Sequence, residues 1–315
     1  MGAGFDLAKY LRNSKAVPVE DLAWDEVRSH PLKQGEVRFL NYMMNIEAHT
    51  IVYLKELLST KVIEDAEVTA FLSCWAYEEF FHGAALERFL RAYVGDDAQA
   101  TRNEASYRLR QSSRLGRGLK RLVAPLVSAA TPDFAAVHMT WGAAQEATTL
   151  HGYESLARQS EHPVLRELMA RIVKDERRHF AFYYNQAERR LGATPGMRRI
   201  TRLAMDRLWR PVGVGAMPPS ESDFAAWYLF RDAQGQAALR EVDQTMAQLP
   251  GMAGWTGLSQ QSNAAIRRVE ALGPEAAAGA VSPPTRSMAS SRPRLPSLSS
   301  CSRVSRRSRR RRSDW

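Results

Sequence analysis

The chain carries YEEFFHG at residues 77–83 and KDERRH at residues 174–179, so the pattern Glu-x-x-His occurs twice. Residues three apart on an α-helix lie on one face, so each pattern can present a carboxylate and an imidazole to the same metal ion. One such pattern is common on solvated helices, but two of them within apolar helical sequence predict a site for a pair of ions. The four residues are Glu79 with His82 and Glu176 with His179.

Each pattern has a partner glutamate closer to the N-terminus. Glu47 lies 32 residues before Glu79, and Glu146 lies 30 residues before Glu176. We expect these two partners to complete or to bridge the ion pair. Four buried carboxylates repel one another and lose hydration, so an apolar bundle tolerates them only when cations neutralise them. Two divalent ions would balance the four negative charges.

Apolar residues recur with a helical period in four stretches of the sequence. We expect the first helix to turn Ile51 and Leu58 inwards, and the third to begin around Thr131 with Pro132 at its first helical position. No stretch of more than a few residues reads as a strand, so the predicted fold class is all-α. The four predicted helices cover residues 35–58, 65–94, 131–159 and 164–192, and further helices are expected outside them at 197–209, 223–249 and 260–272.

The ligand positions agree with two helical hairpins. An antiparallel hairpin brings two ligands to the same height when its turn lies midway between them in sequence. The midpoints of the two glutamate pairs are residues 63 and 161, and both fall at predicted turns. Residues 95–130 remain as a long crossover between the hairpins. This arrangement predicts a ferritin-like four-helix bundle with additional packed helices, in a domain of residues 1–272 with its core at 35–192.

The ligand types narrow the choice of metal. Carboxylate with imidazole and no thiolate favours iron or manganese over zinc. Among helical bundles with this set of ligands, iron is the leading choice. The predicted cofactor is therefore two iron ions, cycling between Fe2+ and Fe3+, with manganese as the alternative.

The net charge of +10 is concentrated near the C-terminus. Residues 281–315 hold ten arginines and one acid, so the other 280 residues carry only about +1. The Arg-, Ser- and Pro-rich segment 273–315 is expected to be a disordered, solvated tail. Non-specific binding to polyanions and a translated frame error are the other interpretations of this segment. No specific nucleic-acid interface is predicted.

The sequence also indicates the cellular compartment in which we expect the protein. The two cysteines, Cys74 and Cys301, do not suggest a disulfide framework. The N-terminal residues contain no signal-like apolar segment, and no uninterrupted apolar run is long enough to span a membrane. We therefore expect a cytoplasmic protein without a membrane span.

Three segments of the chain resemble motifs of the soluble acyl-acyl-carrier-protein (acyl-ACP) desaturases. YEEFFHG is similar to their first EE-x-x-HG motif, and KDERRHFAFY at 174–183 is similar to their DE-x-RH motif. QEATTLHG at 145–152 is similar to their third-helix segment, in which a threonine follows the glutamate by three residues. The resemblance covers about residues 35–190. The connection 95–130 and the sequence after residue 192 show no match.

This resemblance implies an O2-dependent di-iron oxidoreductase that desaturates a fatty acyl chain carried on acyl carrier protein. An external donor such as ferredoxin would reduce the irons, and hydrogens would be removed from two adjacent acyl carbons. A homodimer is also implied. Thr149 would line the oxygen pocket, while Asp175 and Arg178 would support the ligands or lie on the electron path. The implied iron ligands are Glu47, Glu79, His82, Glu146, Glu176 and His179.

Other interpretations of the same residues remain open. The ligand set equally supports a di-iron hydroxylase or N-oxygenase acting on another substrate. A ferroxidase of the ferritin or rubrerythrin kind is the second alternative, although the chain has no CxxC motif for a rubredoxin centre. A metal-free helical scaffold is the third. The basic connection 95–130 is either a docking surface for an acidic carrier protein or a solvated face.

Overall fold

The computed structural model describes residues 5–94 and 131–273. The described residues all belong to one compact unit. The expected crossover at 95–130 lies outside the described residues, and so does the expected tail except for its first residue. Within the described ranges the fold is all-α and contains no β-strand. No helix in these ranges combines the length and the apolar character that crossing a bilayer requires.

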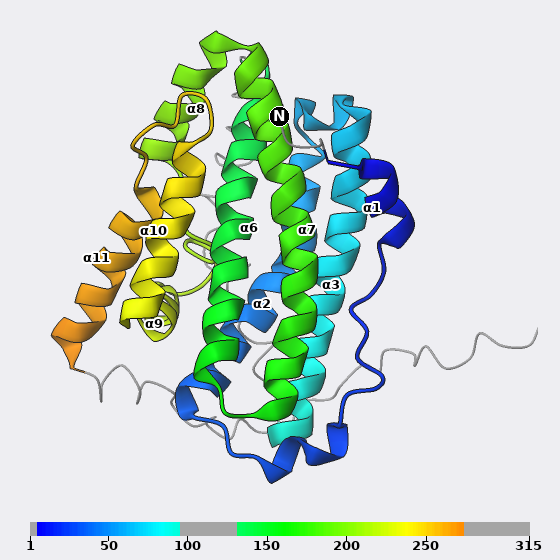
Figure 1. Cartoon of the computed structure of the whole chain (residues 1–315), viewed down its shortest axis with the longest axis vertical. Coiled ribbons are helices and arrows are strands. Elements are labelled where there is room, and N and C mark those ends of the chain that lie inside the picture. Colours follow the sequence, from blue (N-terminus) through cyan, green and yellow to red (C-terminus); the bar gives the residue numbers. More distant parts are fainter. Residues whose placement is uncertain (1–4, 95–130, 274–315) are drawn as a thin grey trace, which may run out of the picture. The chain divides into compact units, whose positions relative to one another are not determined.

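Two helical hairpins form the centre of the molecule, as the sequence predicts (Figure 1). In the first hairpin, the short 3-10 helix η2 (Lys61–Glu64) occupies the turn and contains the predicted midpoint, residue 63. In the second, only residues 160–162 separate the two helices, and this link contains the predicted midpoint, residue 161. The helices of the hairpins are α2 (Gln34–Leu57) with α3 (Ala66–Val94), and α6 (Phe134–Gln159) with α7 (Pro163–Ala193).

Side-chain caps fix where the second hairpin begins and turns. Asp133 caps α6 by accepting a hydrogen bond from the amide of Ala136 at 3.3 Å. Pro132 therefore precedes the cap and does not occupy the first helical position as expected, because the carboxylate satisfies a free amide that a threonine cap at 131 could not reach. His162 caps α7 through Nδ1, which accepts from the amide of Leu165 at 3.2 Å.

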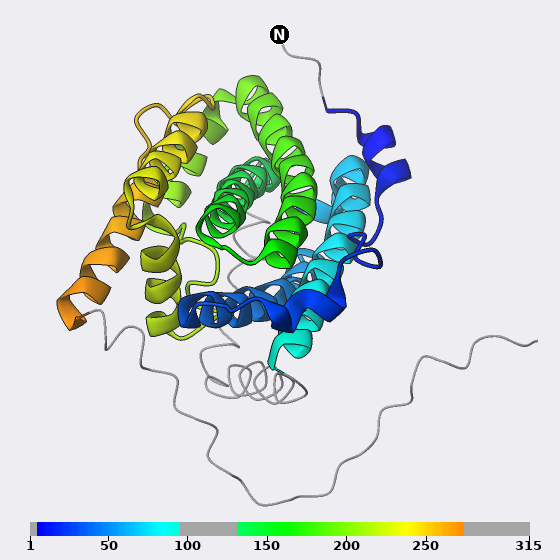
Figure 2. The same cartoon turned by 60° about the horizontal axis from the view of Figure 1, so that its bottom comes forward.

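Helix α6 is the central helix of the described fold. Seen along the bundle, the green α6 is surrounded by other helices (Figure 2). It packs closely on α7 and also contacts α8, α9 and α10, and its buried residues lie on several faces. A helix that is covered on all sides needs small residues where neighbours approach closely, and α6 has Gly142, Ala143, Ala144 and Ala147 in its middle. Gly142 gives room to the ring of Tyr183, which would lie 2.3 Å from a Cβ at this position.

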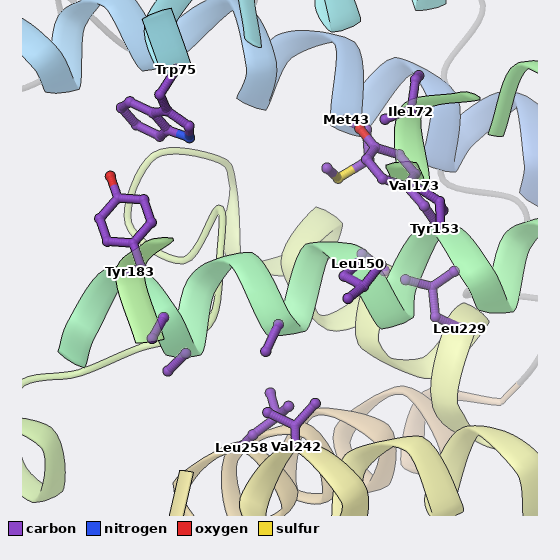
Figure 3. Close-up of a cluster of buried hydrophobic side chains, with 14 of the residues drawn as sticks. Met43, Trp75, Leu150, Tyr153, Ile172, Val173, Tyr183, Leu229, Val242 and Leu258 are labelled. Carbon is purple, nitrogen blue, oxygen red and sulfur yellow. The ribbon is translucent and has the colours of Figure 1, made fainter. Parts of the chain in front are cut away.

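The remaining helices form a layer against α6 and α2. Figure 3 shows Leu229 next to Leu150 of α6, with Val242 and Leu258 below the same helix. Arg38 of α2 forms a bidentate ion pair with Glu221 at 2.8 and 2.9 Å, which ties α9 to the first hairpin. The helices of this layer are α8 (Pro195–Arg207), α9 (Pro219–Phe230), α10 (Ala233–Ala247) and α11 (Gly257–Leu272).

Two of the expectations from the sequence are wrong, one about the outer layer and one about α2. The single helix expected at 223–249 is broken between α9 and α10, because Asp232 leaves the helix and caps the next one at Gly235, 2.6 Å away. Ile51 and Leu58, expected on the inner face of α2, are each 49% exposed. Tyr53 faces α6 instead, and its hydroxyl lies 3.3 Å from Nδ1 of His138.

An N-terminal segment that the sequence did not predict to be helical covers α3. It contains α1 (Leu7–Asn13) and the 3-10 helix η1 (Trp24–Ser29), and both pack on α3. Tyr10 of α1 is buried among aromatic rings, with its ring centre 5.1 Å from that of Phe71. This segment closes one side of the bundle beside the candidate site.

Candidate metal centre

The structure brings all six predicted ligands together in the middle of the two hairpins. They form two groups, and within each group one ligand atom from every residue lies within 4.8 Å of the others. Each group combines three carboxylates with one imidazole, which is a suitable set for a divalent ion. The groups are Glu47, Glu79, His82 and Glu176, and Glu79, Glu146, Glu176 and His179.

Two glutamates belong to both groups. Glu79 and Glu176, the glutamates of the two Glu-x-x-His patterns, are the shared ones. Glu47 and Glu146 each belong to a single group. The sequence left open whether the partner glutamates complete or bridge the pair, and the arrangement favours completion by Glu47 and Glu146. Two ions held in these groups would share the carboxylates of Glu79 and Glu176.

Burial makes this cluster costly without cations. All six residues are buried, and both histidines and Glu176 have no exposed surface. Burial and the negative charge of Glu79 raise the pKa of Glu47 well above its ordinary value. Burial likewise raises the pKa of Glu146, and the charges of Glu79 and Glu176 add to the effect. Protons therefore neutralise part of the cluster when no cation does.

Each histidine turns one ring nitrogen outwards to a carboxylate of the opposite hairpin. Nε2 of His82 on α3 lies 3.2 Å from Asp175 on α7. Nε2 of His179 on α7 lies 2.8 Å from Glu78 on α3. A carboxylate accepts hydrogen bonds, so these contacts assign the proton of each neutral imidazole to Nε2. Each Nδ1 is then left with its lone pair directed into the cluster.

The inward atoms fit a bound cation better than they fit one another. Nδ1 of His82 lies 3.3 Å from an oxygen of Glu176, and Nδ1 of His179 lies 3.2 Å from an oxygen of Glu79. Both Nδ1 atoms and both oxygens of Glu176 are buried without a hydrogen-bond partner among the described residues. Lone pairs that face one another in this way are unfavourable unless a proton or a metal ion lies between them, and the raised pKa values of both histidines favour the proton when no metal is bound. The donor set therefore fits two divalent metal ions.

Arg178 joins the two outer carboxylates. One of its terminal nitrogens lies 2.5 Å from Asp175 and 3.0 Å from Glu78. Burial alone would raise the pKa of Asp175, but its hydrogen bond with His82 and the nearby Arg178 outweigh burial and lower it. The pKa of Glu78 is lowered in the same way, by His179 and Arg178. Both outer groups therefore remain ionised acceptors for the imidazoles. Asp175 thus contacts the candidate ligand His82, and Arg178 contacts the two acids that hold the imidazoles. The roles that the resemblance implies for Asp175 and Arg178 stay predictions.

Glu78, which is not among the predicted ligands, takes part in the site through His179. It is fully buried, and besides His179 and Arg178 it accepts hydrogen bonds from the Tyr10 hydroxyl at 2.8 Å and the Lys15 amide at 3.3 Å. The sequence contains a signal for this role, because an acid precedes both Glu-x-x-His patterns. It contains no comparable signal for Tyr10.

Two aromatic side chains hold the unshared glutamates. Trp75 donates its indole N–H to Glu146 at 3.1 Å, and the hydroxyl of Tyr153 donates a short hydrogen bond to Glu47. In Figure 3 the Tyr183 hydroxyl points towards the indole of Trp75. Helical periodicity can place Trp75 and Tyr153 on buried helix faces, but it cannot predict these hydrogen bonds, because periodicity reports burial and not hydrogen bonding.

Thr149 lies on the wall of an apolar cavity of about 490 Å3 between α2, α6, α9 and α11. It follows Glu146 by three residues on the same helix, and Met43 on the opposite wall precedes Glu47 by four. Along their helices, Thr149 and Met43 are thus each about one turn, roughly 5 Å of axial rise, from the nearest unshared glutamate. The role of Thr149 in an oxygen pocket stays a prediction.

No protein-family model, no curated protein and no solved structure matches this chain. The likeness to acyl-ACP desaturases therefore rests on the three motifs and on the site that they form.

Proposed function

We propose that this protein is a di-iron, O2-dependent oxidoreductase that desaturates a fatty acyl chain carried on acyl carrier protein. The observation that carries the proposal is the pair of ligand groups sharing Glu79 and Glu176. Two ions with common carboxylate ligands are held at a fixed short separation, which suits a substrate that binds both. Desaturation as the outcome, and acyl carrier protein and a homodimer as the partners, rest on the resemblance of YEEFFHG, QEATTLHG and KDERRH.

The apolar cavity beside the site supports an acyl substrate. Cavities that take small ligands are commonly of 300 to about 1,000 Å3 and mostly apolar, and this one has both properties. Its walls would hold a flexible chain in one place, which lowers the entropic cost of bringing reacting atoms together. Thr149 lies where this chain would approach the ligands.

When bound, two iron ions would activate O2 with electrons from an external donor such as ferredoxin. The chain's own residues keep the ligands in position. Asp175 and Glu78 hold the imidazole protons at Nε2, so that both Nδ1 atoms stay available to the metal. Trp75 and Tyr153 fix the carboxylates of Glu146 and Glu47 by hydrogen bonds.

The first experiment measures metal content and the optical spectrum of the oxidised protein. We expect about two irons per chain and an absorption of bridged ferric iron that changes when Glu146 is replaced by alanine. A content well below one ion of any metal would indicate a metal-free scaffold. Two manganese ions per chain would support the proposed metal site but would identify its cofactor as manganese and not iron.

The second experiment identifies the reaction. Chemically reduced protein is incubated with O2 and either stearoyl-ACP or a panel of free acyl and aryl compounds, and the products are weighed by mass spectrometry. Loss of two hydrogens from the acyl chain supports the proposal. Gain of one oxygen would indicate a hydroxylase or N-oxygenase instead. Iron oxidation with no change in any organic compound, together with a large shell on a sizing column, would indicate a ferritin-like ferroxidase.

A further inference from the structure

The wall of the apolar cavity carries two arginines that the proposed function does not account for. Arg210, which follows α8, and Arg268 of α11 both line the cavity, and both are exposed. Phe39 and Met43 line it as well and are buried. The lining therefore combines cationic side chains at the surface with apolar side chains in the interior.

The backbone at Arg210 is held in place by neighbouring side chains. The amide of Gln145 donates to the carbonyl of Arg210 at 2.8 Å, and Gln261 donates to the carbonyl of the buried Trp209 at 2.9 Å. The Arg210 guanidinium also donates to the Trp209 carbonyl at 2.6 Å. No carboxylate among the described residues forms an ion pair with Arg210. Its remaining donors are therefore positioned and available to an incoming anion.

Arg268 already binds a carboxylate with the geometry that an anionic ligand would use. Its guanidinium contacts both oxygens of Asp223 on α9, at 2.7 and 2.6 Å, and Asp223 also lines the cavity. The Arg268 side chain is 59% exposed. Asp223 is only 19% exposed and competes with a ligand anion for the guanidinium, but the donors of Arg268 that face away from Asp223 remain accessible. A guanidinium fork matches carboxylate and phosphate groups equally well.

We infer that the cavity binds an amphiphile with an anionic head group, whose head is held by Arg210 and Arg268 and whose apolar chain extends towards Thr149. The inference rests on the proposed function only for the identity of the chain as an acyl group. The head is either the carboxylate of a free acid or the phosphodiester of a carrier arm. Both present oxygens to the same two guanidinium groups.

Calorimetric titration of the full chain in excess chelator tests this binding without metal or turnover. The probes are dodecanoate, methyl dodecyl phosphate and dodecanol, which share one chain and differ in the head, all used below the concentrations at which they form micelles. We expect both anions to bind at least about tenfold more tightly than dodecanol. A tighter carboxylate assigns the site to free acids, and a tighter phosphodiester assigns it to a chain on a phosphate-linked arm.

Substitutions then locate the head and the chain. Arg210→Gln and Arg268→Gln should each weaken the anions about tenfold and leave dodecanol unchanged, whereas Arg267→Gln, at an exposed neighbour on the same helix, should change nothing. Asp223→Asn should strengthen the anions several-fold, because it removes the competing carboxylate. Ala226→Phe, which fills the cavity wall, should weaken all three probes.

Equal affinity for dodecanol and the anions, or anion binding that is unaffected by both arginine substitutions, would overturn the inference. Circular dichroism and melting curves identify any variant that does not fold, and the exposed arginine variants are expected to fold normally. A negative result in these binding experiments would not change the metal content or the optical spectrum of the protein. It is therefore distinguishable from a failure of the proposed function.

Discussion

The hairpins α2–α3 and α6–α7 supply equivalent ligands from very different surroundings. Each contributes one single glutamate and one Glu-x-x-His pattern, and each holds the other's histidine through an acid. Helix α6 is nevertheless enclosed by α7, α8, α9 and α10, whereas α2 and α3 expose Ile51, Leu58, Tyr77 and Phe80 by 41 to 49%. The equivalence of the ligands is therefore a property of the site and not of a general symmetry in packing.

This contrast also explains where the cavity lies. The outer layer reaches α2 mainly through α9, by contacts such as Arg38 with Glu221 and Phe39 with Tyr228, and the space beside these contacts remains open as the apolar cavity. Both hairpins contribute equivalent ligands, but the apolar cavity lies between α2 and α6, the two helices that carry the unshared glutamates.

The largest expected effect separates shared ligands from unshared ones. Glu176→Ala removes a ligand from both groups, so we expect the protein to lose nearly all its metal after loading with Fe2+ or Mn2+ under anaerobic conditions. Glu47→Ala and Glu146→Ala each disturb one group, so each should retain about half the metal of the parent. Elemental analysis by mass spectrometry measures the content.

Glu161→Ala, at an 88% exposed position in the α6–α7 turn, is the control and should keep the full content. If Glu47→Ala lost as much metal as Glu176→Ala, the assignment of shared and unshared ligands would be wrong.

A smaller effect compares the acids behind the two histidines. Asp175→Asn and Glu78→Gln should each weaken metal binding about 10- to 100-fold, because each releases an imidazole from its orienting partner. Glu78→Gln should also lower the free energy of unfolding by about 1–3 kcal/mol, because the buried Glu78 accepts from four groups. Metal titration and chemical denaturation measure the two quantities.

Tyr10→Phe is the matched variant for this pair. It removes a single hydrogen bond to Glu78, so it should cost about 1 kcal/mol of stability. Its metal affinity should change less than that of Glu78→Gln. Unchanged metal affinity in both acid variants would contradict an orienting role for Asp175 and Glu78.

The smallest expected effect is a pH dependence of the metal-free protein. The pKa values of Glu47 and Glu146 are raised by burial and by neighbouring carboxylates. Burial lowers the pKa values of His82 and His179, but hydrogen bonds and charges of acidic neighbours outweigh it and raise them. A group with a raised folded-state pKa stabilises the fold below its unfolded pKa, here 4.5 for Glu and 6.5 for His, and this stability is lost as the pH rises through the folded-state value.

In excess chelator, the melting temperature should therefore fall from pH 5 to pH 9, and bound Mn2+ should remove most of this slope. Glu47→Gln and Glu146→Gln should each flatten it, by similar amounts if the two hairpins are equivalent at the site. A melting temperature that rises over this range without metal would show that the carboxylates of the cluster are compensated in another way.

The sequence was sufficient for the hairpins and for the ligands because both follow from local rules. Helical periodicity places Glu79 with His82, and Glu176 with His179, on inner faces, and the midpoint rule places the turns at 63 and 161, where the structure has them. The break at Asp232 was missed because a helix-capping acid and a helix-interior acid look alike in a periodic pattern.

What the sequence by itself determined is the set of residues that can bind metal and the two hairpins that carry them, since residues three apart and the position of a turn depend only on the local chain. The tertiary structure alone decided which carboxylates are shared, that Glu78 supports His179 and Asp175 supports His82, and that Arg210 and Arg268 line one apolar cavity. The two contacts between imidazole and acid join residues 93 and 101 positions apart in the sequence. Such contacts form only through the packing of the helices, which no local sequence pattern encodes.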